Sequence, residues 1–287
     1  MVSNMIYIVT AVYAEAHAII THFHLKKDVS FTRFQIFDNQ EAGIRLVVTG
    51  TGGVAAAVAI ADTCKRAQAG EFLVNIGTCA GIQAEEKVYR VGQIFLCNKI
   101  KEQVTGRTFY PDILYSHRFA EGQILTGAVP YTPDKGEDGF FLYDMEAAAV
   151  YQAGLYYFGP HQMSFLKVIS DYGDGEKVTP ELVMELMEGH MEEISEYLNL
   201  LRKAGGCEQE GANCPDSRLQ KEADLLCTDM HCSKTMEAAL RQCIRYGILS
   251  GADIEGVRKE MYFEGKLPCK DKKEGKLCFE EFKRRVL

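Results

Sequence analysis

Short apolar runs alternate with segments rich in small residues over the first 204 residues. Four of these runs have the length and composition of buried strands: residues 5–12, 71–77, 92–100 and 166–170. Residues 31–38 and 44–50 alternate apolar and polar positions, as the two strands of a hairpin do. An alanine-rich stretch opened by glycines, 52–67, predicts a helix. Strands that alternate with helices indicate an α/β layered fold with a mostly parallel or mixed sheet.

The helical period is clearest after Pro180. Thr179 is a suitable N-cap, and Pro180 lies in the first turn. Apolar residues then recur with a period near 3.6 as far as Leu201. Ala204-Gly205-Gly206 predicts the end of this helix. We therefore place a domain boundary here, between residues 1–204 and 205–287.

The segment 205–287 predicts a small, mostly helical module. It begins with a polar linker, and three stretches have the character of short helices: residues 219–230, 234–246 and 253–263. Gly247 suits a helix end, and the charged stretch 266–278 reads as a loop before a last helical turn. Seven of the ten cysteines lie in this module, but none forms a CxxC pair. We expect packed thiols and an accessory or partner-binding role rather than a metal site.

Composition and charge indicate a protein with a sizeable core and an acidic first part. With 47% hydrophobic and 25% charged residues, the chain has enough apolar material for a sizeable core. The segment 205–287 has 15 acidic and 15 basic residues, so the whole net charge of -8 lies before it. This acidity argues against a nucleic-acid or anionic-membrane surface. The apolar start runs into Glu15 without a basic leader, so we expect a cytoplasmic protein with no membrane segment.

Four motifs follow one another along the chain: AVYAE (11–15), NIGTCAG (75–81), YDMEAAAVY (143–151) and VISDYGD (168–174). At this spacing they resemble the nucleoside phosphorylase/nucleosidase family, and within it the branch that hydrolyses 5′-methylthioadenosine and S-adenosylhomocysteine. The resemblance covers roughly residues 5–204. It implies a three-layer α/β/α fold around a mixed twisted sheet, to which the C-terminal helices are an appendage. It also implies no metal or organic cofactor, a purine nucleoside substrate and a homo-oligomer.

The resemblance also assigns roles to three carboxylates. Cleavage of a ribose–purine bond needs a proton on the leaving base and support for an oxocarbenium-like sugar cation. Asp171 would protonate N7 of the purine, and Glu15 would activate water. Glu146, with Met145, would hold the ribose hydroxyls. The alternative readings are a capping aspartate at Asp171 and an exposed helix-start glutamate at Glu15, where Tyr13 and Ala14 depart from the family's acidic neighbours.

The remaining candidates would bind substrate. Small residues after a strand allow the backbone to approach a ligand closely. By resemblance the binding residues also include Thr78, Cys79, Ala80, Gly81, Gly52, Ser170, Tyr131, Asp144 and Phe109. Cys79 is expected to be a packed thiol, and Asp144 a mainly structural residue. Tyr131, beside Pro130, would take the place of the family's purine-stacking aromatic residue. Phe109, with Val104 and Tyr110, could form an apolar pocket for the 5′ group.

Water is favoured over phosphate as the nucleophile. Phosphorylases of the superfamily carry an arginine in the segment that matches NIGTCAG, and this chain has none there. Arg33, Arg45 and Arg66 lie outside the matching motifs. Two alternatives stay open: a phosphate-dependent nucleoside phosphorylase, and a nucleoside-binding scaffold whose C-terminal helices recruit a protein partner. The 5′ substituent and the choice between 6-amino and 6-oxo purine also stay open.

Overall fold

A computed structural model describes residues 4–30, 33–68, 70–82, 89–133, 139–173, 178–210, 215–250 and 252–286. The predicted hairpin residues 31–32, Asp174 of the fourth motif and linker residues 211–214 lie outside these ranges. The chain divides into two compact units, Met1–Glu208 and Gln209–Leu287.

The first unit is built on one mixed sheet, as predicted. Its strands are β1 (Ile6–Thr10), β2 (Lys26–Lys27), β3 (Gln35–Asn39), β4 (Ile44–Val48), β5 (Phe72–Gly81), β6 (Ile94–Glu102), β7 (Thr108–Phe109), β8 (Ala120–Thr126), β9 (Leu142–Asp144) and β10 (Met163–Asp171). The order is β10-β6-β8-β9-β5-β1-β4-β3-β2, with β7 beside β6. Because β10 pairs with both β6 and β5, strands β5, β9, β8, β6 and β10 close into a ring.

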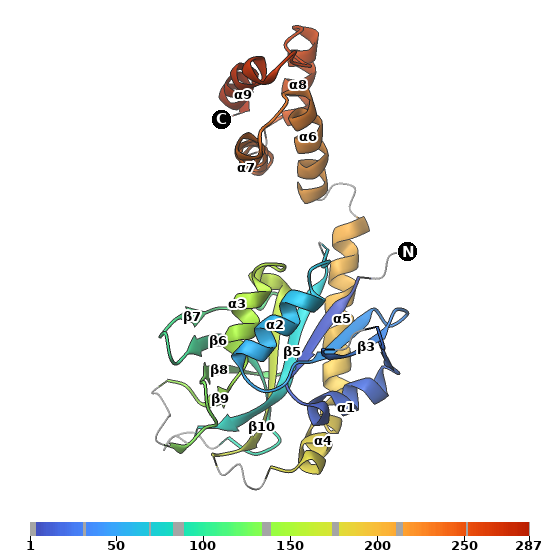
Figure 1. Ribbon diagram of the computed structural model, residues 1–287, viewed down its shortest axis with the longest axis vertical. Helices are drawn as coiled ribbons and strands as arrows, with labels where there is room; N and C mark the ends of the chain where they lie inside the picture. The colour runs from blue at the N-terminus through green and yellow to red at the C-terminus, as the bar shows by residue number, and fades with distance from the viewer. Residues whose placement is uncertain are drawn as a thin grey trace. The chain divides into compact units, whose positions relative to one another are not determined.

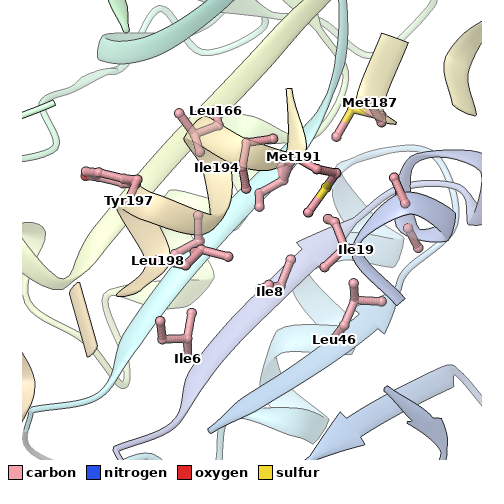
Figure 2. Packing of buried hydrophobic residues seen from close by; sticks show 14 of the residues in the cluster. Ile6, Ile8, Ile19, Leu46, Leu166, Met187, Met191, Ile194, Tyr197 and Leu198 are labelled. Carbon is pink, nitrogen blue, oxygen red and sulfur yellow. The ribbon is translucent and has the colours of Figure 1, made fainter. Parts of the chain in front are cut away.

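Helices cover both faces of this sheet (Figure 1). On one face lie α1 (Tyr13–His22), α4 (Pro180–Glu188) and α5 (Met191–Glu210). Their apolar side chains pack on Ile6, Ile8, Leu46 and Leu166, as Figure 2 shows. On the other face, α2 (Gly53–Thr63) and α3 (Ala147–Gly154) contact each other and bury a second core around Val9.

The long C-terminal helix of this unit differs from the prediction in two ways. It is interrupted after Glu188, where His190 turns its ring to the Gly92 carbonyl oxygen, 2.6 Å from Nε2. It also continues past Ala204-Gly205-Gly206 to Glu210. Gly205 does not end the helix because its missing side chain serves packing: a Cβ there would collide with the Gly70 carbonyl oxygen.

The second unit contains α6 (Pro215–Asp229), α7 (Lys234–Ser250), α8 (Ile254–Phe263) and α9 (Lys272–Val286). Gly247 lies inside α7 rather than at its end, because it gives room to Ile254 and Val286. The charged stretch 266–278 is likewise only partly a loop. Helix α9 begins at Lys272 and has 15 residues, since its charges face solvent while Cys278, Phe279 and Phe282 face the core.

No helix in the described ranges is long and apolar enough to cross a membrane.

Candidate active site

Parallel strands β1, β5 and β10 end at the same edge of the sheet, so the segments that follow them converge. A cavity of about 270 Å³ lies at this edge. Ten of the predicted residues line it: Glu15, Thr78, Cys79, Ala80, Tyr131, Asp144, Met145, Glu146, Ser170 and Asp171. Four separate motifs therefore meet at one site.

Glu15 lies in the first turn of α1, but it is buried rather than exposed, with 3% of its surface accessible. Its Oε1 accepts hydrogen bonds from the Thr78 amide at 2.7 Å and the Thr78 hydroxyl at 2.9 Å. Its Oε2 accepts from the amides of Ala11 and Val12 at 2.8 and 3.2 Å. These four donors fix the carboxylate, and rotation of the Thr78 hydroxyl would free an acceptor position for water.

Glu15 also explains why position 77 is glycine. A Cβ on Gly77 would lie 2.8 Å from the Glu15 Oε1 atom. The strand backbone therefore passes directly against the carboxylate, and any larger residue would push Glu15 out of position.

Asp171 is the last residue of β10 and is only partly buried. Its Oδ2 accepts a hydrogen bond from the Ser170 hydroxyl at 2.8 Å, and its Oδ1 accepts from the Gly173 amide at 2.7 Å. Tyr131 packs over Gly173, where a Cβ would come within 2.9 Å of the ring. Asp171 and Tyr131 thus both lie beside Gly173, and both line the cavity.

Glu146 and Asp144 lie on either side of Met145 at the start of α3. The Glu146 Oε1 atom accepts a hydrogen bond of 2.6 Å from the Gly52 amide. Asp144 accepts from the Thr126 hydroxyl at 2.7 Å and from the Ala147 amide at 2.9 Å, and its Oδ2 lies 2.8 Å from Lys167 Nζ. Asp144 therefore anchors the start of α3, whereas Glu146 reaches from the same segment into the cavity wall.

Lys167, which pairs with Asp144, was not predicted from the sequence as a residue of the site. It lies on β10 with 2% of its surface accessible, and burial, which lowers a lysine pKa, is outweighed by Asp144 and Glu146, so that its pKa is raised overall. The available signal was a lysine inside the apolar run LKVIS, because a lysine in a buried strand needs an acidic partner.

Three predicted residues do not line the cavity. Gly52 lies behind Glu146, which it holds through its amide. Gly81 packs under the Tyr172 ring. Phe109, in β7, stacks on Tyr151 of α3 with 5.1 Å between ring centroids and packs against the second core. Val104, predicted beside it, lines a separate hollow of about 480 Å³ that also includes Gly52 and Met145.

Burial and the neighbouring Asp144 raise the pKa of Glu146 to about 7, against the opposing effects of Lys167 and the Gly52 amide. The ordinary value is 4.5. A raised acid pKa contributes stability that is fully present below about pH 4.5 and is lost as pH rises through about 7.

At pH ~8 the free energy of unfolding of Glu146→Gln is therefore expected to exceed that of the unsubstituted chain by on the order of 3 kcal/mol, so that it unfolds at a higher urea concentration. Near pH ~4.5 the two free energies of unfolding should be equal. The amide oxygen of glutamine can still accept the Gly52 hydrogen bond. Urea titrations at both pH values provide the measurement. Equal differences at the two pH values would contradict the assigned pKa.

Charge and thiol chemistry limit what this site can do. Burial raises the pKa of the Cys79 thiol well above its ordinary value, which keeps the thiol neutral. Among the described residues that line the cavity there is no arginine or lysine. Arg45 instead pairs with Asp38 at 2.8 Å. Within the described ranges, no group of three or more potential ligands is placed to hold a metal ion.

The first unit has the fold of a known class of enzymes. Its solved structural neighbours include the 5′-methylthioadenosine/S-adenosylhomocysteine nucleosidase of Colwellia psychrerythraea in complex with adenine, with 23% identity and a TM-score of 0.55 over 70% of this chain and 96% of that one. The Neisseria meningitidis nucleosidase in complex with methylthio-immucillin-A has 18% identity and a TM-score of 0.54, over 70% and 99%. The S. pneumoniae nucleosidase has 20% identity and a TM-score of 0.54, over 69% and 98%.

At these identities the likeness establishes the fold. No protein-family model matches the sequence, and no curated protein matches it either. The C-terminal helical unit lies beyond the matched part of the chain.

Proposed function

We propose that this chain is a purine nucleosidase that hydrolyses the N-glycosidic bond of a 5′-methylthioadenosine-like nucleoside. The observation that carries the proposal is the meeting of Glu15, Glu146 and Asp171 in one cavity, from three distant parts of the sequence. The structural neighbours are nucleosidases of the same fold, which supports this reading.

The proposed mechanism divides the work among the three carboxylates. Asp171 delivers a proton to N7 of the purine, so that the base leaves as a neutral molecule. Glu146 accepts hydrogen bonds from the ribose hydroxyls, and its negative charge stabilises the developing sugar cation. Glu15 takes a proton from the water that attacks the anomeric carbon. Met145 and Tyr131 supply the apolar walls of the same cavity.

Hydrolysis is preferred to phosphorolysis because the described lining lacks a cationic side chain. Phosphate bound in proteins usually recruits arginine or lysine in addition to backbone amides. Water needs no such partner.

The test is a turnover panel on the purified chain. 5′-Methylthioadenosine, 5′-deoxyadenosine, S-adenosylhomocysteine and inosine are incubated with and without phosphate, and the free base is measured. We expect equal release of base in both conditions, with the 5′-methylthio or 5′-deoxy substrate preferred. Strict dependence on phosphate would assign the chain to the phosphorylases instead. Binding of a nucleoside without any turnover would favour the scaffold alternative.

A further inference from the structure

Four of the five described thiols of the C-terminal unit lie in two pairs. Cys227 and Cys232 lie close enough for each thiol to shift the pKa of the other, and the same holds for Cys269 and Cys278. Both sulfur atoms of the second pair also lie 3.5 Å from the Lys266 carbonyl oxygen. Among the described side chains, Cys243 on α7 has no such thiol partner.

The end of α6 brings the first pair together. His231 has a φ of 50°, in the left-handed region, and the Cys232 amide donates a 3.0 Å hydrogen bond to the Cys227 carbonyl oxygen. This bond closes a Schellman turn, in which the two residues that flank the turn contact each other. The backbone of this turn therefore places Cys227 and Cys232 beside each other.

The segment that carries the second pair is fastened to the same turn. The Cys269 amide donates to the Asp229 carbonyl oxygen at 2.8 Å, and His231 Nε2 lies 3.0 Å from the Cys269 carbonyl oxygen. A Cβ on Gly275 would collide with the Met230 carbonyl oxygen, so α9 packs directly against the end of α6. Hydrogen bonds and close packing thus connect the segment at Cys269 and the start of α9 to the end of α6.

The two pairs differ in access. Cys269 and Cys278 are buried, whereas Cys227 and Cys232 are half-buried. A small molecule can therefore reach the first pair without opening the core of the unit.

We propose that Cys227 and Cys232 form a reversible intramolecular disulfide, with a low-molecular-weight disulfide such as oxidised glutathione as the oxidant. The Cys227 thiolate attacks one sulfur of the oxidant, forms a mixed disulfide and releases one thiolate. The Cys232 thiolate then attacks the Cys227 sulfur and releases the second. Two protein thiols are oxidised, one external disulfide is reduced to two thiols, and two protons are accepted by the released thiolates.

The order of attack follows from the contact between the two thiols. Burial raises the pKa of Cys232, and the contact with Cys227 raises it further, to about 12. The same contact lowers the pKa of Cys227. Burial keeps the pKa of Cys227 above its ordinary value as well. Cys227 therefore ionises first, and the reaction is expected to be slow at neutral pH and faster in mild alkali.

The experiment uses the full, reduced chain. It is exposed to oxidised glutathione at about pH 8.5, near the ordinary thiol pKa, then labelled with N-ethylmaleimide and digested with trypsin. Cys227 and Cys232 fall in one tryptic peptide, residues 222–234, whereas Cys243 falls in another, residues 242–245. We expect peptide 222–234 to become unlabelled and lighter by two hydrogen atoms, and labelling to return after dithiothreitol.

Two variants make the result specific. Cys232→Ser is expected to hold glutathione on Cys227 as a persistent mixed disulfide, because the second attack is lost. Cys243→Ser, the matched control, is expected to oxidise like the unsubstituted chain. Continued labelling of both Cys227 and Cys232, a lasting glutathione adduct in the unsubstituted chain, or a link from either residue to Cys269 would overturn the proposal. None of these outcomes depends on nucleoside turnover.

Discussion

Asp171→Asn is expected to lower nucleoside turnover by about 10²–10⁴-fold, the usual contribution of a positioned general acid. The substitution removes the proton donor but keeps the shape of the side chain. Its amide oxygen can still accept from the Gly173 amide, and its amide nitrogen can donate to Ser170 Oγ. We therefore expect nucleoside binding and the urea midpoint to change little. Single-turnover release of free base measures the chemical step directly.

Ser170→Ala is the matched control for this variant. It removes one hydrogen bond to Asp171 Oδ2 but leaves the carboxyl group in the cavity. Its loss of turnover should be far smaller than that of Asp171→Asn. If Asp171→Asn turned over substrate at the unsubstituted rate, the base would have to be protonated by another group, and the proposed division of work would be wrong.

Lys167→Met is expected to destabilise the chain by about 3–5 kcal/mol, the usual cost of breaking a buried ion pair from one side. The side chains of Lys167 and Asp144 are 2% and 1% accessible, so an unpaired Asp144 would stay out of reach of water. Urea unfolding at pH ~7 measures the loss. Because Lys167 also lowers the pKa of Glu146, the pH dependence of turnover should move toward alkali in any folded fraction.

A surface pair provides the comparison. Lys65 lies 3.2 Å from Asp62, but 56% of its side chain is accessible, so Lys65→Met should cost less than about 1 kcal/mol. The double variant Lys167→Met with Asp144→Asn should be less destabilised than the sum of the two single variants, since no buried charge is left alone. Additive losses would show that Lys167 acts through packing rather than through charge.

Much of the fold followed from periodicity alone. The buried strands near residues 5–12, 71–77 and 166–170, the hairpin, and the alanine-rich helix are all present. Strands β8 and β9 were not predicted. Strand β9 has only three residues, too few to show a period, and β8, AEGQILT, does not alternate apolar and polar positions regularly. The glycines were the main source of error. Gly205 and Gly247 both looked like helix ends, but each lies inside a helix where a neighbouring element needs the space of a side chain.

The sequence indicated most of the residues that line the cavity, but not the contacts that hold them in place. Ten of the thirteen candidates line the cavity, nine of them from the four motifs and Tyr131 from outside them. Three of the motifs meet because β1, β5 and β10 are parallel and end at one sheet edge. The motifs could not show that Glu15 is enclosed by four donors, or that Lys167 neutralises Asp144. Those contacts join residues far apart in the sequence, and the resemblance did not point to them. The roles of the three carboxylates stay predictions until turnover is measured.

The closed ring of strands has a consequence for how this protein behaves at high concentration. An unpaired strand is a template on which another chain can add, and this is a common route to aggregates. With β5 and β10 joined, the described sheet has edges at β3 and the two-residue β2 on one side, and at β7, also of two residues, beside β6. The outermost strand, β2, consists of Lys26 and Lys27, both exposed, so a second copy approaching along β2 meets like charge and only two residues of strand.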